Sequence, residues 1–94
     1  MKDPITNIVV TERFWIRGDV GSAVFPGWIA RHVARLGLTG RVVGQEAACV
    51  TMVISGPADL LDALALGCSL GPQEVWVDDI TRSAENDGQG LSFA

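Results

Sequence analysis

The residues best suited to chemistry lie in a turn rich in small residues that leads into a helix, between Gly18 and Pro26. This turn reads GDVGSAVFP. Pro26 suits the first turn of a helix, where its missing N–H would have no intrahelical partner. A loop that enters a helix N-terminus presents unpaired N–H groups and the positive end of the helix dipole. We therefore predict a site for a small anion, with these candidate loop residues: Gly21, Ser22, Ala23, Val24 and Phe25.

Other side chains that could act as acids or bases are poorly placed for catalysis. His32, the only histidine, lies nearly two turns into the helix, away from the loop. Packing beside Trp28 is therefore favoured over a role as general base. Asp78 and Asp79 are neighbours on an expected strand, so their side chains should diverge rather than form a catalytic carboxylate pair.

The two cysteines do not indicate a metal site. Cys49 and Cys68 form no C-x-x-C pair and have no histidine cluster nearby. We expect two free thiols, no metal and no cofactor. Cys68 falls on the apolar stripe of an expected helix, whereas Cys49 alternates out of phase with the apolar residues of its strand. Cys49 should therefore be the more reactive thiol.

Hydrophobic periodicity predicts six elements that position this loop. Strands are expected over residues 9–18, 40–45, 49–55 and 74–82, and helices over 26–36 and 57–70. The order βαββαβ is the split βαβ arrangement of ferredoxin-like folds. We predict an α+β sandwich in which a four-stranded antiparallel sheet carries two helices on one face. A flexible N-terminal arm (1–8) should precede a single domain (9–94), and residues 91–93 could add a short edge strand.

Three stretches share one ungapped register with a known family pattern. Gly18–Pro26 fits G-x-V-Q-G-V-x-F-R, Leu36–Gly44 fits L-G-L-x-G-W-V-x-N, and Val50–Gly56 fits V-E-x-x-A-x-G. Gly71 and Pro72 also stand where the pattern tends to have Gly-Pro. The chain thereby resembles the acylphosphatase family. The resemblance implies a ferredoxin-like fold and hydrolysis of the carboxyl-phosphate bond of acyl phosphates.

The departures from the family pattern concern its catalytic positions. Pro26 stands where the phosphate-binding arginine is expected, and Gly44 where the water-positioning asparagine is expected. Asp19 adds a negative charge at the mouth of the loop. Ala47 and Ala48 replace the usual Asp-Gly hairpin turn. Because alanine resists positive φ, we expect a longer or altered loop over residues 44–48. Hydrolysis by the family mechanism should therefore be nearly absent.

Composition limits the class of protein. The 94 residues allow one domain, and a hydrophobic fraction of 48% is typical of a globular chain. A net charge of −4 argues against nucleic acid as the main partner. No apolar run approaches the ~17–25 residues of a membrane helix, and the N-terminus does not resemble a signal peptide. We expect a cytoplasmic monomer or weak homodimer that binds neither nucleic acid nor membranes.

Three functions stay open from the sequence. The preferred one is a catalytically degenerate acylphosphatase-like domain that serves as a protein-interaction module or binds a small anion or acyl phosphate weakly. The second is a low-activity acylphosphatase in which another cation, from Arg17, Arg31 or Arg41, replaces the family's arginine. The third is a ferredoxin-like regulatory module for a small molecule.

Overall fold

The computed structural model describes residues 8–85, and the expected elements of this part are all present. Their order is β1 (Val9–Asp19), α1 (Phe25–Arg35), β2 (Thr39–Glu46), β3 (Cys49–Pro57), α2 (Ala58–Leu70) and β4 (Trp76–Ala84). Each boundary lies within two residues of the expected one. The expected edge strand at 91–93 and all but the last residue of the expected arm lie outside the described residues.

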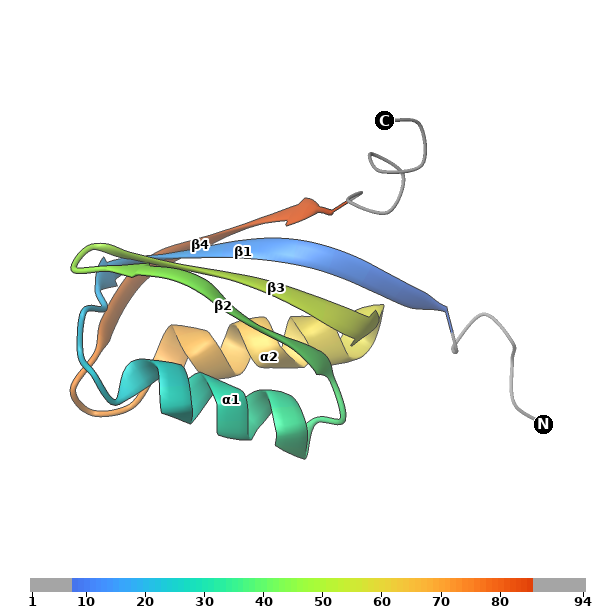
Figure 1. Ribbon diagram of the computed structural model, residues 1–94, viewed down its shortest axis with the longest axis horizontal. Helices are drawn as coiled ribbons and strands as arrows, with labels where there is room; N and C mark the ends of the chain where they lie inside the picture. Colours follow the sequence, from blue (N-terminus) through green and yellow to red (C-terminus); the bar gives the residue numbers. More distant parts are fainter. Residues whose placement is uncertain (1–7, 86–94) are drawn as a thin grey trace.

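The four strands form one antiparallel sheet in the order β2-β3-β1-β4. Both helices lie on the same side of this sheet, as Figure 1 shows. The predicted ferredoxin-like α+β fold is therefore confirmed. Within residues 8–85, no helix has the length and apolar character that crossing a membrane requires.

The core lies between the helices and one sheet face because strand side chains alternate between faces. On β3, Val50, Met52 and Ile54 are fully buried, and the residues between them are half-buried. Phe14 and Ile16 of β1 point into the same layer. The helices contribute further buried side chains to the core: Ile29, Val33, Leu61, Leu64 and Cys68.

The β2–β3 hairpin is altered, as one form of the expectation allowed, but its loop is not longer. Ala47 and Ala48 form a two-residue turn, and Glu46 pairs directly with Cys49. No non-glycine residue in the described part of the chain has positive φ, so the turn is not the favoured primed type. The irregularity lies instead at Val43, where the register shifts between Val42 and Gly44. A bulge increases local twist, which a turn of two negative-φ residues does not supply.

Candidate functional site

The candidate anion loop connects β1 to α1 and is held against the β2–β3 turn. The N–H of Gly18 donates to the carbonyl of Ala48, and that of Val20 to the carbonyl of Ala47, both at 3.1 Å. A Cβ on Gly21 would stand only 2.9 Å from the Cα of Ala47. The small residues thus allow the loop backbone to lie directly on the hairpin.

Some backbone N–H groups of the candidate loop residues donate hydrogen bonds within the loop, and others do not. The N–H of Val24 donates to Oγ of Ser22 at 3.3 Å, and the N–H of Phe25 donates to the carbonyl of Ser22 at 3.1 Å. The N–H groups of Gly21, Ser22 and Ala23 have no acceptor within residues 8–85. Three of the five candidate residues therefore offer a backbone donor. Anion binding by them stays a prediction.

Gln45 of β2 reaches into this loop, a contact that the sequence did not indicate. Its Nε2 donates to the carbonyl of Ser22 at 3.0 Å and to that of Val20 at 3.3 Å. In a trans peptide the N–H points opposite to the preceding carbonyl. The N–H groups of Gly21 and Ala23 are therefore directed away from Gln45. This one carboxamide fixes the orientation of two of the three available donors.

The bulge at Val43 explains why Gln45, and not Gly44, faces the loop. Gly44 pairs with Thr51, and a Cβ on Gly44 would lie 3.9 Å from the Cβ of Thr51. Thr51 alternates with the buried Val50, so it lies on the sheet face that the helices leave open. A side chain at the position of the family's asparagine would therefore project away from the loop in this chain.

Of the cations considered as replacements for the family's arginine, only Arg31 lies along the first turns of α1. Its Nη1 stands 3.7 Å from where a Cβ on Gly27 would be, so the side chain extends back toward the helix N-terminus. Arg17 instead contacts Thr81 and Asp79 on β4, at 2.7 and 3.7 Å. Pro26 lies in the first helical turn, as expected, and supplies no N–H.

His32 is a packing residue on α1, as predicted. Its ring stacks on that of Trp28 with the centroids 3.9 Å apart, and its Nδ1 lies 3.1 Å from the carbonyl of Trp28. Asp78 and Asp79 also have separate partners: Asp78 accepts from the indole N–H of Trp76 at 3.0 Å, and Asp79 contacts Arg17. No catalytic pair forms from these carboxylates.

Both thiols are free, as expected, and they differ in environment. Cys49 is half-buried, whereas Cys68 is fully buried on the inner side of α2. Burial raises the pKa of the Cys68 thiol from 9.0 to about 12, because the thiolate would lose its hydration. Within residues 8–85, no group of three His, Cys, Asp or Glu side chains could hold a metal ion.

Relatives in sequence identify the family of this chain. The acylphosphatase of Rhodospirillum rubrum is 32% identical over 79 residues, which cover 82% of this chain and 87% of that protein. The acylphosphatase of Caldivirga maquilingensis is 35% identical over 72 residues, which cover 76% of each chain. The chain belongs to the acylphosphatase family. No protein-family model matches it.

Solved structures agree with the acylphosphatase fold. The acylphosphatase from Coxiella burnetii superposes with a TM-score of 0.76 at 22% identity, over 84% of this chain and 82% of that one. The acylphosphatase from Bacillus subtilis gives 0.74 at 19% identity, over 83% and 86%. Full-length HypF, solved in a phosphate- and nucleotide-bound form, also gives 0.74 at 15% identity, but only 10% of its chain is matched. At these identities the superpositions show the fold alone.

Proposed function

We propose that this member of the acylphosphatase family is catalytically degenerate and acts as a protein-interaction module or a weak binding module for small anions. The observation that carries the proposal is Pro26 in the first turn of α1, where it supplies neither a guanidinium nor an N–H. Gly21, Ser22 and Ala23 still offer backbone donors, which supports weak anion binding. The exposed Asp19 at the end of β1 adds a repulsive charge near this loop.

The missing arginine allows a rough magnitude to be assigned. A hydrogen bond to a charged group contributes about 1.5–3 kcal/mol, which corresponds to roughly 10–150-fold in affinity. Without it, inorganic phosphate should bind the loop with a dissociation constant of about 1 mM or weaker. A group that stabilises or positions the reacting atoms typically contributes on the order of 10²–10³ in rate. Turnover of an acyl phosphate should therefore be close to the uncatalysed background.

The experiment compares wild type, Pro26→Arg and Ala34→Arg with benzoyl phosphate as substrate and inorganic phosphate as ligand. Ala34 is an exposed residue of α1 on a later turn, so Ala34→Arg adds the same charge outside the loop. We expect no measurable catalysis by wild type and at least a tenfold gain in phosphate affinity for Pro26→Arg only. Robust turnover by wild type would refute degeneracy. Equal gains for both arginine variants would mean that net charge, and not the loop position, sets the affinity.

One observation favours a second function, that of a low-activity acylphosphatase. The guanidinium of Arg31 lies beside Gly27, one residue after the family's arginine position. If wild type hydrolyses benzoyl phosphate slowly, Arg31→Gln should abolish that activity, and Arg35→Gln in the last turn of α1 should not. Equal effects of the two changes would exclude Arg31 as the replacement cation.

The remaining parts of the proposal concern location and partners. We propose a cytoplasmic protein, which agrees with two free thiols in residues 8–85. We also propose that it is a monomer or weak homodimer without affinity for nucleic acid or membranes. Light scattering at several concentrations tests the first point, and binding to anionic vesicles and to duplex DNA tests the second.

A further inference from the structure

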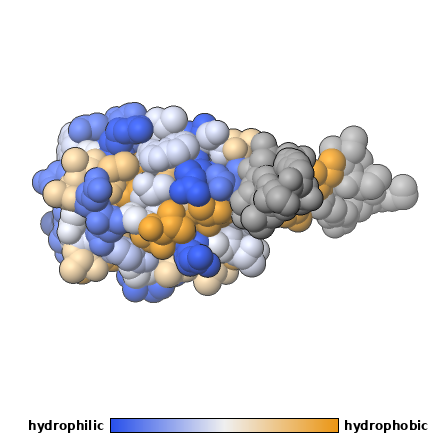
Figure 2. Space-filling view, turned by 45° about the horizontal axis from the view of Figure 1, so that its top comes forward, coloured by the Kyte–Doolittle hydropathy of each residue, from blue (hydrophilic) through white to orange (hydrophobic). Residues whose placement is uncertain are grey.

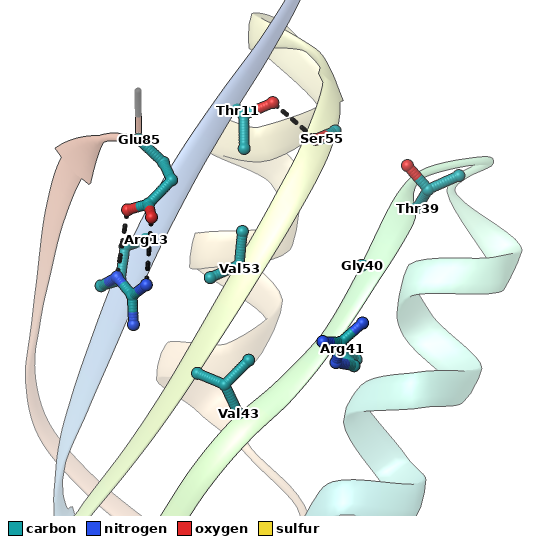
Figure 3. A pocket seen from close by; sticks show the side chains of 9 residues that line it. All are labelled: Thr11, Arg13, Thr39, Gly40, Arg41, Val43, Val53, Ser55 and Glu85. Carbon is teal, nitrogen blue, oxygen red and sulfur yellow. Dashed lines mark hydrogen bonds and ion pairs between the residues drawn. The ribbon is translucent and has the colours of Figure 1, made fainter. Parts of the chain in front are cut away.

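A hollow of about 410 Å³ lies on the sheet face that the helices leave open, toward the start of β1 and away from the anion loop (Figure 3). Its volume falls within the range of about 300–1,000 Å³ that small-molecule sites occupy. Figure 2 shows the molecule turned so that its sheet side comes forward, and hydrophilic and hydrophobic residues are interspersed in this view. We call this feature the open-face hollow and define it by two rows of side chains.

The first row consists of hydroxyl groups in register across three strands. Thr11 of β1 and Thr39 of β2 both pair with Ser55 of β3. Oγ1 of Thr11 and Oγ of Ser55 are 2.6 Å apart, so one hydroxyl donates to the other. This row therefore offers neutral hydrogen-bond donors and acceptors along one side of the hollow.

The second row places two arginines on either side of a valine. Arg13 of β1 and Arg41 of β2 both pair with Val53 of β3. Neighbouring strands lie about 4.8 Å apart, so the Cα atoms of the two arginines are separated by roughly 10 Å. Both arginines line the hollow, one on each side of Val53. Val43, 44% exposed, adds a second apolar contact surface to the hollow.

The two arginines differ in their ionic partners. Nε and Nη2 of Arg13 donate to the two carboxylate oxygens of Glu85, both at 3.0 Å (Figure 3). This hydrogen bonding holds the pKa of Glu85 below its usual range. Arg41 has no ion pair and no side-chain hydrogen bond to any residue between 8 and 85. Among the described residues that line the hollow, two arginines face one carboxylate, which gives these side chains a net charge of +1.

We propose that the open-face hollow binds a small organic monocarboxylate, with Arg41 as its cationic ligand. A single negative charge balances the described charged side chains of the hollow, whereas a dianion would outweigh them. The planar guanidinium matches a carboxylate through two parallel hydrogen bonds, the geometry that Arg13 and Glu85 already adopt. The hydroxyl row and the two valines would contact the rest of the molecule. This site is separate from the anion loop, and the inference does not rest on the proposed function.

The test is a titration of the full chain with benzoate in which the backbone amide NMR signal of each residue is monitored. Benzamide has the same shape without the charge and serves as the matched ligand. We expect benzoate to shift the signals of Arg41, Val53 and Ser55 to saturation, and benzamide to leave them unchanged. Arg41→Gln should weaken benzoate binding at least tenfold. Arg35→Gln, an exposed arginine on α1, should leave it unchanged.

A second arm tests the charge balance with sulfate. In wild type, sulfate should bind the hollow at least tenfold more weakly than benzoate. Glu85→Gln raises the net charge of the hollow by one, so sulfate should gain at least tenfold there and approach benzoate in affinity. No saturation by about 20 mM benzoate, or equal benzoate affinity of the two arginine variants, would overturn the site. Equal affinity of wild type for sulfate and benzoate would overturn the assignment to a monocarboxylate.

Discussion

Raising the pH from about 8 to about 10.5 should destabilise the folded chain, because Cys68 must stay a neutral thiol in the core. The side chain is fully buried, and its pKa lies near 12 in the fold and near 9.0 when solvated. Between these values the thiolate forms in the unfolded chain only. Proton release then draws the equilibrium toward the unfolded state. The stability that the neutral thiol provides is therefore complete below about pH 9 and is lost progressively as the pH rises toward 12.

The size of this effect follows from the gap between the two pKa values. Each pH unit above the unfolded pKa costs about 1.4 kcal/mol, so about 2 kcal/mol is lost by pH 10.5. For a domain of this length, that corresponds to a fall of roughly 8–16 °C in Tm. Few other side chains change charge in this pH range, since the chain has no tyrosine and one lysine, Lys2. The loss of stability can therefore be assigned to the thiol. Cys49, the other free thiol, supplies the matched control.

Urea unfolding followed by circular dichroism, for wild type, Cys68→Ala and Cys49→Ala, measures this loss directly. Cys68→Ala should be less stable than wild type at pH 8, because a buried sulfur is removed, but it should lose little further stability by pH 10.5. Cys49→Ala should keep the wild-type decline. A wild-type loss below about 0.5 kcal/mol, or an undiminished decline in Cys68→Ala, would refute the reasoning from burial.

Three further predictions concern the thiols and the end of β2. A thiol reagent should modify Cys49 well before Cys68 in the folded protein, as followed by mass spectrometry, and equal rates would contradict the burial of Cys68. Gln45→Ala should reduce the free energy of unfolding in urea by about 1–2 kcal/mol, because two hydrogen bonds to loop carbonyls are lost. Glu46→Ala, at the neighbouring exposed position, should cost less than about 0.5 kcal/mol, and matching losses would argue against a special role for Gln45. Gly44→Asn should leave phosphate binding by the loop unchanged in an amide-shift titration, whereas a gain would place its side chain at the loop.

The fold could be predicted from the sequence because its signals are local. On β3, the alternation of Val50, Met52 and Ile54 with polar or smaller residues determines which face is buried. The inner stripe of α2 follows in the same way from the helical period. For the hairpin, the sequence predicted a longer or altered loop, and only the altered form is present, because the local rule allows two solutions. Alanine excludes a primed turn, and the chain keeps a two-residue turn with a bulge at Val43 instead of lengthening the loop.

The open-face hollow could not be predicted, because it depends on strand register. Arg13, Arg41 and Val53 come from three strands, and nothing in the spacing of these residues indicates that they share one row. Register is a property of paired strands, and a shift by one residue would move each side chain to the opposite face. The pairing of Arg13 with Glu85 depends further on the position at which β4 ends.

The register of β2 also separates the alignment of this chain with the family from the family's chemistry. Gly44 matches the family's asparagine in sequence, but the extra residue at Val43 turns it toward Thr51 and brings Gln45 to the loop. An asparagine restored at Gly44 would therefore orient no water at the anion site. The carboxamide that does reach the loop uses its N–H groups on the carbonyls of Val20 and Ser22, which leaves its oxygen as an acceptor. A gain in phosphate affinity should therefore require only the replacement of Pro26 by arginine. Any catalysis by that variant should depend on the side chain of Gln45.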